Sequence, residues 1–391
     1  MKPFSDFKSN LLTRNLILVY SLASLGMLGH VLFEPLIPIF ARILGASGFE
    51  VGLLTSGFMI ARAAASYVIG RVSDHWQKRR IFIQIGFIFL CLITLSYILI
   101  RNYYGLLIMR FGQGICSGFI WPIAQIMVVE FSSPKYRTRA LSLYQIMGRF
   151  GALLSRLFLS FILIIAVYFG LEEPNSFKLA FAAAGFILII GLIISTKLPA
   201  VPPDRDRRKG EGRSPVIIFV LAFVFGAMMA MAPISLVYIN EYFGLSTLSI
   251  AILLLLLDGL SMLAMYGASH LTDSIGIKNS LWFILIPCFV SAIALPFARS
   301  LLIFIIVYFI LRMAISSFLP LSRSYATSDN SESGTNVGKL NMMSNIGSMI
   351  GPIIGGFLYD KLLGSYRISG YSLIALLLIP ASIVLISMRR R

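Results

Sequence analysis

Long apolar segments recur along the whole chain, and short polar stretches separate them. An α-helix rises 1.5 Å per residue, so about 20 apolar residues cross the roughly 30 Å of hydrocarbon in a bilayer. Twelve segments come close to that length or exceed it: 15–43, 49–70, 80–100, 104–130, 138–169, 178–197, 215–243, 247–270, 280–297, 301–325, 335–360 and 366–388. Strands of a membrane barrel would instead alternate over about ten residues. The sequence therefore predicts an all-α integral membrane protein with twelve transmembrane helices.

The distribution of charge indicates how the chain is oriented. Only 13% of the residues are charged, about half the share in ordinary soluble proteins. The net charge is nevertheless +17. When cations at the ends of segments are counted with the adjoining loop, 21 of the 33 Lys and Arg lie on the side of the termini and of the loops after even-numbered segments, against six on the other side. This pattern predicts a multi-pass protein of the cytoplasmic membrane with both termini in the cytoplasm. Attraction to anionic lipid explains the basic charge, so we expect no nucleic-acid partner.

The sequence offers little for enzymatic chemistry. Cys91, Cys116 and Cys288 all lie in apolar segments without a CxxC spacing, which disfavours disulfides and cysteine-bound metal. Neither an HExxH metal motif nor a GxSxG nucleophile motif occurs, and no GxxxxGK[ST] nucleotide-binding loop is present. We expect no catalytic residue, no metal, no cofactor and no enzymatic activity.

A stretch dense in Pro, Gly and charge, residues 198–214, separates the sixth and seventh segments. Its composition is typical of a solvated cytoplasmic linker between an N-terminal half, 1–197, and a C-terminal half, 215–391. The halves repeat each other. Matching residues recur 198 to 202 positions apart and in the same order: Asp74 and Asp273, Arg110 and Arg312, Pro122 and Pro320, Gly151 and Gly351. A parallel six-plus-six repeat explains these offsets.

Two motifs link the chain to a known family. The segment GRVSDHWQKRR follows the pattern G-x-x-x-D-x-x-G-x-R/K-R/K, with Gln77 in place of the third glycine and His75 in place of the usual arginine. The fourth segment carries R-x-x-Q-G at Arg110, Gln113 and Gly114. With twelve segments and the repeat, the chain resembles the major facilitator superfamily over nearly its whole length. The resemblance implies two pseudo-symmetric six-helix bundles and a substrate site between them that opens alternately to each side.

The resemblance also implies a role for the loop after the second segment. In the family, the aspartate of this motif contacts the eleventh span and helps to latch the cytoplasmic side closed, so Gly70, Asp74 and Arg79 are the latch candidates. A carboxylate here can face the positive N-terminal end of a helix while the cations stay among anionic headgroups. The alternative is that the charged residues of this loop only determine the orientation of the chain in the membrane.

Charged side chains inside the apolar segments are candidates for function, because each costs at least about 2.5 kcal/mol to insert. The candidates for substrate binding or coupling are these residues together with two polar neighbours: His30, Glu34, Arg62, Arg110, Gln113, Arg149, Arg156, Asp258 and Arg312. In the family the fifth span faces the eighth, so Asp258 and Arg149 form a candidate gate or coupling pair. A static pair that only relieves the cost of burial is the alternative.

His30 and Glu34 are four residues apart and share a helical face, with Arg62 on the next segment. Both can titrate in a partly dry cavity, so they are candidates for carrying a coupling proton. The alternative is that His30 is hydrogen-bonded to a backbone carbonyl and that the charge of Glu34 is neutralised by Arg62.

Five arginines against two acids leave the membrane interior positive, and arginine can grip a carboxylate or phosphate with two hydrogen bonds. This predicts a small anionic organic substrate. Methionines of the seventh and eighth segments, including Met228 and Met262, could instead form the adaptable wall of a multidrug pocket.

The eleventh segment contains GSMIGPIIGG, whose Gly347, Gly351, Pro352 and Gly355 allow close helix packing and bending. Antiporters of the family often carry this pattern in the fifth span, which here reads GRFGALLSR, with Arg156 at the site that matches Gly356. The departure disfavours drug/proton antiport. We expect a monomeric secondary transporter with protons as the coupling ion. A membrane sensor that keeps the fold and moves no solute is the alternative from another class.

Overall fold

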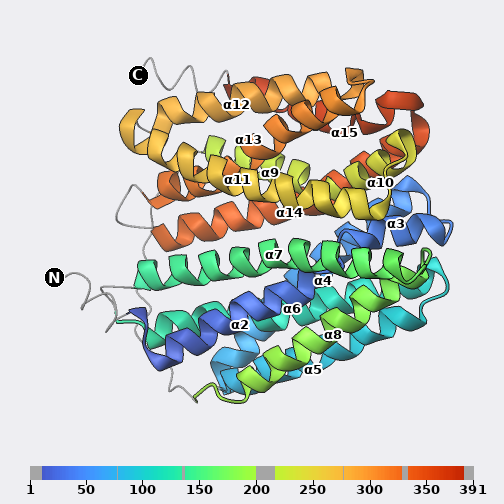
Figure 1. Ribbon diagram of the computed structural model, residues 1–391. Coiled ribbons are helices and arrows are strands. Elements are labelled where there is room, and N and C mark those ends of the chain that lie inside the picture. The colour runs from blue at the N-terminus through green and yellow to red at the C-terminus, as the bar shows by residue number, and fades with distance from the viewer. Residues whose placement is uncertain are drawn as a thin grey trace. The chain divides into compact units, whose positions relative to one another are not determined.

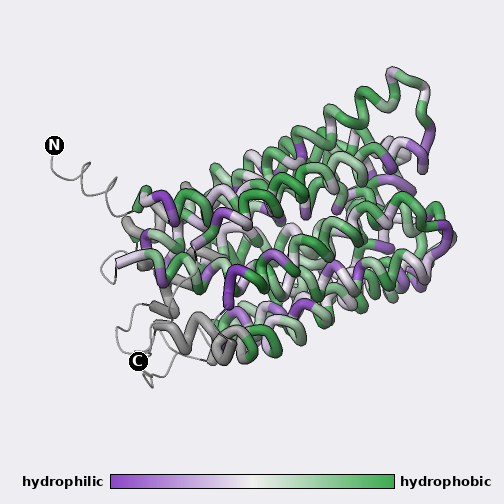
Figure 2. Tube along the Cα trace, turned by 90° about the horizontal axis from the view of Figure 1, so that it is seen from below, coloured by the Kyte–Doolittle hydropathy of each residue, from purple (hydrophilic) through white to green (hydrophobic). Residues whose placement is uncertain are grey.

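The computed structural model describes residues 11–76, 78–133, 137–199, 216–275, 277–327 and 333–382, and within these ranges the chain is helical with short turns and no strand. Ten stretches are long and apolar enough to cross a membrane: Arg14–Ile43, Gly48–Ile69, Arg79–Leu99, Tyr103–Phe131, Arg139–Tyr168, Asn175–Ser195, Ile217–Phe243, Thr247–Ala264, Asn279–Phe297 and Leu301–Phe318. They coincide in order with the first ten predicted segments. Figure 2 shows that apolar residues dominate these helices while hydrophilic residues gather at the turns and at a few points between them.

The last two predicted segments are also helical. The eleventh is α14 (Ser333–Lys361), whose Ser, Asn and Gly make it less apolar than the other ten. The twelfth begins at α15 (Gly370–Ala375) and continues as an apolar helical stretch to Ser382, the last described residue. The prediction of an all-α membrane fold is confirmed.

The helices form two contact units. The first comprises Met1–Leu44 and Gly57–Arg207, and the second comprises Gly45–Ser56 and Arg208–Arg391. In Figure 1 the helices of the first unit run from blue to green and most of those of the second unit run from yellow to red. Helix α4 (Gly48–Trp76) is divided between the units, because its first turns, up to Ser56, belong to the second unit. Residues 200–214 of the predicted linker lie outside the described residues.

In the first unit, α2 (Arg14–Val31) packs on α7 (Arg137–Tyr168) and α8 (Asn175–Ser195), while α5 (Arg79–Ser96) packs on α6 (Tyr103–Phe131) and α8. The crossing of α2 and α7 is close enough to require glycine. A Cβ on Gly151 would overlap the backbone carbonyl of Ser24.

The second unit repeats this crossing. Its helices are α9 (Val216–Ala230), α10 (Ala232–Phe243), α11 (Thr247–Ile275), α12 (Ile277–Ala294), α13 (Leu301–Thr327), α14 and α15. Here α9 packs on α14, and a Cβ on Gly351 would overlap the carbonyl of Ala227. Gly351 and Ala227 stand 200 and 203 positions after Gly151 and Ser24, so the repeat read from the sequence is also a repeat of helix packing.

The first helix of each unit is broken at matching positions. Pro35 separates α2 from α3 (Leu36–Ile43), and Pro233, 198 residues later, follows the break between α9 and α10 at Met231. Proline has no N–H, so the regular helical hydrogen bond to the carbonyl four residues earlier cannot form at Pro35 or at Pro233. Each break therefore interrupts the regular backbone hydrogen bonding within an apolar segment.

Candidate functional site

The break in the first unit carries a charged cluster. Glu34 lies in the turn between α2 and α3, and its two carboxylate oxygens face two arginines. Arg110 of α6 donates from Nη2 to Oε1 at 3.2 Å, and Nη2 of Arg156 on α7 lies 4.0 Å from Oε2. The side chain of Glu34 is 38% accessible, whereas those of Arg110 and Arg156 are only 4% and 14% accessible. The carboxylate of Glu34 is therefore the accessible member of the cluster, and the guanidinium groups of Arg110 and Arg156 are largely buried.

Gln113 connects this cluster to the surrounding helices. Its Oε1 accepts from Arg110 Nη1 at 2.8 Å and from the Tyr97 hydroxyl at 3.1 Å. Its Nε2 lies 3.4 Å from Nδ1 of His30 and 3.5 Å from the backbone oxygen of the same residue. Since Gln113 is fully buried, these contacts hold Arg110 and His30 in fixed positions.

Aromatic rings enclose the cluster. The Arg110 guanidinium carbon Cζ lies 4.4 Å from the centroid of the Phe58 ring. The centroid of the His30 ring lies 5.8 Å from that of Phe58 and 6.0 Å from that of Trp121. These contacts place His30 among aromatic side chains beside the network. They support the interpretation of His30 as a buried histidine whose Nδ1 has a hydrogen-bond partner within the protein. Arg62 of α4 lies within electrostatic reach of Glu34.

The structure thus brings together five of the predicted residues, His30, Glu34, Arg62, Arg110 and Gln113, with Arg156 as a sixth. In the alternative interpretation Arg62 neutralises Glu34, whereas the closest guanidinium in the structure is that of Arg110. One carboxylate among three arginines leaves the cluster positive. Such a cluster can attract an anion, and its accessible carboxylate can exchange a proton.

The second unit has its own polar cluster. Asp258 of α11 forms an ion pair with Arg312 of α13, whose Nη1 donates to the Tyr308 hydroxyl at 3.5 Å. The Tyr308 and Tyr371 rings meet edge to face with their centroids 6.4 Å apart, and the Tyr371 hydroxyl lies 2.9 Å from Oγ of Ser235 on α10. The chain of contacts therefore runs from the ion pair to the segment just after the second helix break.

Pairing of Asp258 with Arg312 was not anticipated from the sequence. The expected partner, Arg149, lies in the other unit, and that pairing stays a prediction. The tyrosines and Ser235 were also missed, although the spacing of four between Tyr308 and Arg312 places them on one helical face.

The latch candidates lie at the end of α4 and the start of α5. Gly70 and Asp74 belong to α4, but the surroundings of Gly70 and the side chain of Asp74 lie outside what the structure describes. Arg79, in the first turn of α5, forms a buried ion pair with Glu130 of α6 at 2.7 Å. Glu130 was missed, although an acid that ends an apolar segment would have singled it out.

The predicted packing glycines line one face of α14. Cβ atoms on Gly347 and Gly351 would overlap carbonyls of α9, and one on Gly355 would meet Met231 at the second break. The carbonyl of Pro352 lies against Gly52 in the first turns of α4. These glycines lie at close helix contacts, and their role in helix packing and bending stays a prediction.

The end of α14 forms hydrogen bonds with the first residues of α4. Both carboxylate oxygens of Asp360 accept hydrogen bonds of 2.7 Å, one from Gly48 N and the other from Phe49 N. Two turns further along α4, the Ser56 hydroxyl donates to the backbone oxygen of Met349 at 2.6 Å. Asp360 therefore caps the helix from a position more than 300 residues away in sequence.

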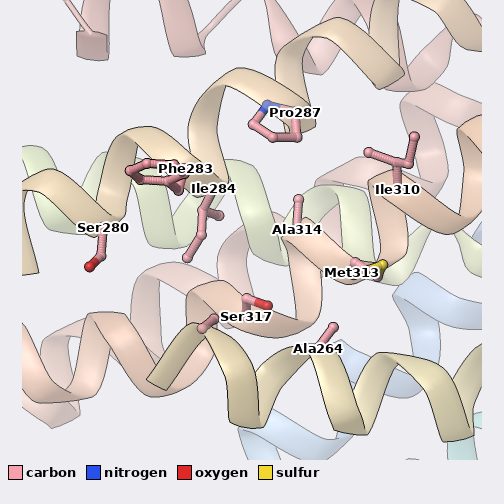
Figure 3. A pocket seen from close by; sticks show the side chains of 10 residues that line it. Ala264, Ser280, Phe283, Ile284, Pro287, Ile310, Met313, Ala314 and Ser317 are labelled. Carbon is pink, nitrogen blue, oxygen red and sulfur yellow. The ribbon is translucent and has the colours of Figure 1, made fainter. Parts of the chain in front are cut away.

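A cavity of about 310 Å³ lies among α11, α12 and α13 and is shown in Figure 3. Its walls are mainly apolar, with the hydroxyl-bearing Ser280 and Ser317 among them. None of the charged residues described above lines it, so the cavity is separate from both charged clusters. Among the described residues no group of His, Cys, Asp and Glu is arranged to hold a metal.

Comparison with known proteins identifies the relatives of the chain. Residues 19–352 match the family model described as Major Facilitator Superfamily. An uncharacterized MFS-type transporter of Methanocaldococcus jannaschii is 29% identical over 216 residues, which span 54% of this chain and 53% of that protein. Multidrug resistance protein 1 of Bacillus subtilis is 25% identical over 375 residues, 89% of this chain and 90% of the relative.

The fold also has solved counterparts. A bacterial homolog of the human lysosomal transporter Spinster, in its inward-facing and occupied conformation, superposes with a TM-score of 0.76 over 96% of each chain. Its sequence identity of 17% means that the likeness concerns the fold alone.

Proposed function

Because the chain belongs to the Major Facilitator Superfamily of membrane transporters, we propose that it is a secondary transporter of a small anionic organic solute, coupled to protons. The observation that carries the proposal is the positive cluster at the first helix break. Arg110 and Arg156 contact one accessible carboxylate, that of Glu34, and Arg62 lies within electrostatic reach of it. Broken helices at matching points of two repeats are where transporters of several folds bind substrate and coupling ion.

Transport would proceed by alternating access of the two halves, 1–197 and 215–391, across the cell membrane, with both termini in the cytoplasm. Gly70, Asp74 and Arg79 would latch the cytoplasmic side. The buried bond of Arg79 to Glu130 supports this role, since it fixes the start of α5 next to the loop. Asp258 and Arg149 are the proposed gate pair.

Coupling to protons would depend on Glu34. An anion that binds the arginines competes with Glu34 for them, and protonation of Glu34 would release the arginines to the anion. Substrate and proton would then bind together, as symport requires. The monomer holds all of these residues and is the proposed functional unit.

The second candidate is export of lipophilic compounds by proton antiport. The 25% identity to Multidrug resistance protein 1 of Bacillus subtilis over most of both chains favours it. Against it, Met228 of the supposed adaptable wall is fully buried. Arg156 also replaces the glycine that antiporters of the family carry in the fifth span.

The test is a thermal-stability screen of the purified protein with small organic anions, lipophilic cations and neutral sugars at two pH values. A ligand at 100 times its Kd stabilises the state that binds it by about 2.7 kcal/mol. Stabilisation by anions that is lost in Arg62→Gln, followed by pH-driven uptake of the same anion into liposomes, is the expected result.

Two other results would contradict the proposal. Stabilisation by lipophilic cations alone would make multidrug export the working function. Binding of a ligand without flux of that ligand in liposomes, with or without a gradient, would favour a sensor of the same fold.

A further inference from the structure

The break at Pro35 leaves a backbone carbonyl that a cation can bind. In a continuous helix the carbonyl of Val31 would accept from the N–H of residue 35, which proline lacks. The Glu34 N–H contacts the Val31 oxygen at 3.2 Å across a tighter turn. The second acceptor lone pair of that oxygen remains available to another donor.

Arg156 supplies that donor. Its Nη1 donates to the Val31 oxygen at 3.1 Å, and its Nη2 lies 4.0 Å from Oε2 of Glu34. One guanidinium thus spans a freed carbonyl and a carboxylate at the point where α2 ends. Carbonyls of an unwound segment are ligands by which broken-helix transporters bind a coupling cation, and carboxylate oxygens are also common ligands of hard cations.

The second unit contains the same break without these charges. At the offset of 198 that relates Pro35 to Pro233, Glu34 corresponds to Ala232. At the offset of 200 that relates Gly151 to Gly351, Arg156 corresponds to Gly356. There the side chain of Met231 packs against Gly355 and Gly370. Acid and arginine are therefore present together at one break and absent together from the other, as expected if they function as a pair.

We propose that Arg156 is a built-in cation, whose guanidinium occupies the position between the Val31 carbonyl and Glu34 that a monovalent coupling cation would otherwise occupy. The wild-type protein then needs no Na⁺ at this break. If the chain is the transporter proposed above, its transport is independent of Na⁺, and proton movement on Glu34 is the remaining means of coupling here.

The inference is tested by removing the guanidinium and supplying a free cation. Arg156→Gly introduces the residue found at the matching position of the second unit. The melting temperature of the purified full chain is measured in detergent with millimolar guanidinium, Na⁺ or choline chloride at equal ionic strength. Arg156→Lys retains a charge on the side chain. Arg149→Gly removes an arginine from the same helix, about 10 Å earlier along its axis.

The expected result is a saturable rise in the melting temperature of Arg156→Gly, on the order of 2 °C, with guanidinium and with Na⁺ but not with choline. Wild type, Arg156→Lys and Arg149→Gly should show no such cation-specific rise. If Arg156→Gly does not fold, Arg156→Gln keeps a donor for the Val31 carbonyl without the charge, and the same criterion applies to it.

Absence of a cation-specific rise in a folded, monodisperse variant would overturn the inference, because Arg156 would then be only a hydrogen-bond donor to the helix break. An equal rise in Arg149→Gly would overturn it as well, since the effect would be general. The measurement needs no transported solute, so its failure is distinct from failure of the transport proposal.

Discussion

Removal of the negative partner from the Asp258–Arg312 pair should be costly. Asp258→Asn leaves the shape of the side chain almost unchanged but leaves the Arg312 guanidinium without a counter-charge. The two side chains are only 23% and 21% accessible, Arg312 Nε has no hydrogen-bond partner, and the Tyr308 hydroxyl at 3.5 Å is a weak acceptor.

Two independent estimates give the magnitude. Breaking a buried ion pair by removing one partner costs about 3 to 5 kcal/mol. A single arginine at the centre of a membrane helix costs about 2.5 to 3.5 kcal/mol. Because a fifth of each side chain is accessible, the lower end applies, and we expect Asp258→Asn to lower the free energy of unfolding by about 3 kcal/mol.

A double-mutant cycle separates the pair from its surroundings. The single variants of the cycle are Asp258→Leu and Arg312→Met. The double variant removes both charges together and should restore most of the loss, because buried ion pairs contribute little relative to apolar replacements. Stability is measured by denaturant unfolding of each purified variant in one detergent. The reasoning is refuted if Asp258→Asn costs less than about 1 kcal/mol, or if the double variant is as unstable as the sum of the single ones.

Four further predictions concern helix packing, capping and coupling. Gly351→Ala should destabilise the protein by about 1 to 3 kcal/mol because its Cβ would overlap an α9 carbonyl, whereas Gly267→Ala, with open space around it on α11, should be neutral or stabilising. Their melting temperatures should move in opposite directions or at least differ clearly. Asp360→Ala removes both hydrogen bonds from the start of α4 and should cost about 1 kcal/mol in the same assay, and an unchanged stability would contradict the capping role. Glu34→Gln should abolish pH-driven uptake while solute exchange persists, and uptake that responds normally to a pH gradient would exclude Glu34 from coupling. Asp74→Asn should change the proportions of inward- and outward-open molecules in spin-label distance measurements, and identical distributions would count against the latch.

The candidate residues could be found from the sequence because charge in an apolar segment is rare. Glu34, Arg110 and Asp258 stand out by composition alone, and the R-x-x-Q-G motif adds Gln113. The break at Pro35 was not predicted, since the apolar segment continues through it. A proline four residues after Val31 was nevertheless a visible signal for a freed carbonyl.

The number and order of the membrane helices, and the repeat that relates the two halves, were determined by the sequence itself, because the thickness of a bilayer sets the length of an apolar segment and a duplication leaves a constant offset. Which arginine faces which acid was decided only by the tertiary structure. The pairs Arg110–Glu34 and Arg312–Asp258 join residues 76 and 54 positions apart on different helices. Helices in lipid are apolar on nearly every side, so hydrophobic periodicity does not reveal which face turns inward. That rotation is set by close contacts such as Gly151 on Ser24, and it directs Arg110 and Arg156 to the two oxygens of Glu34.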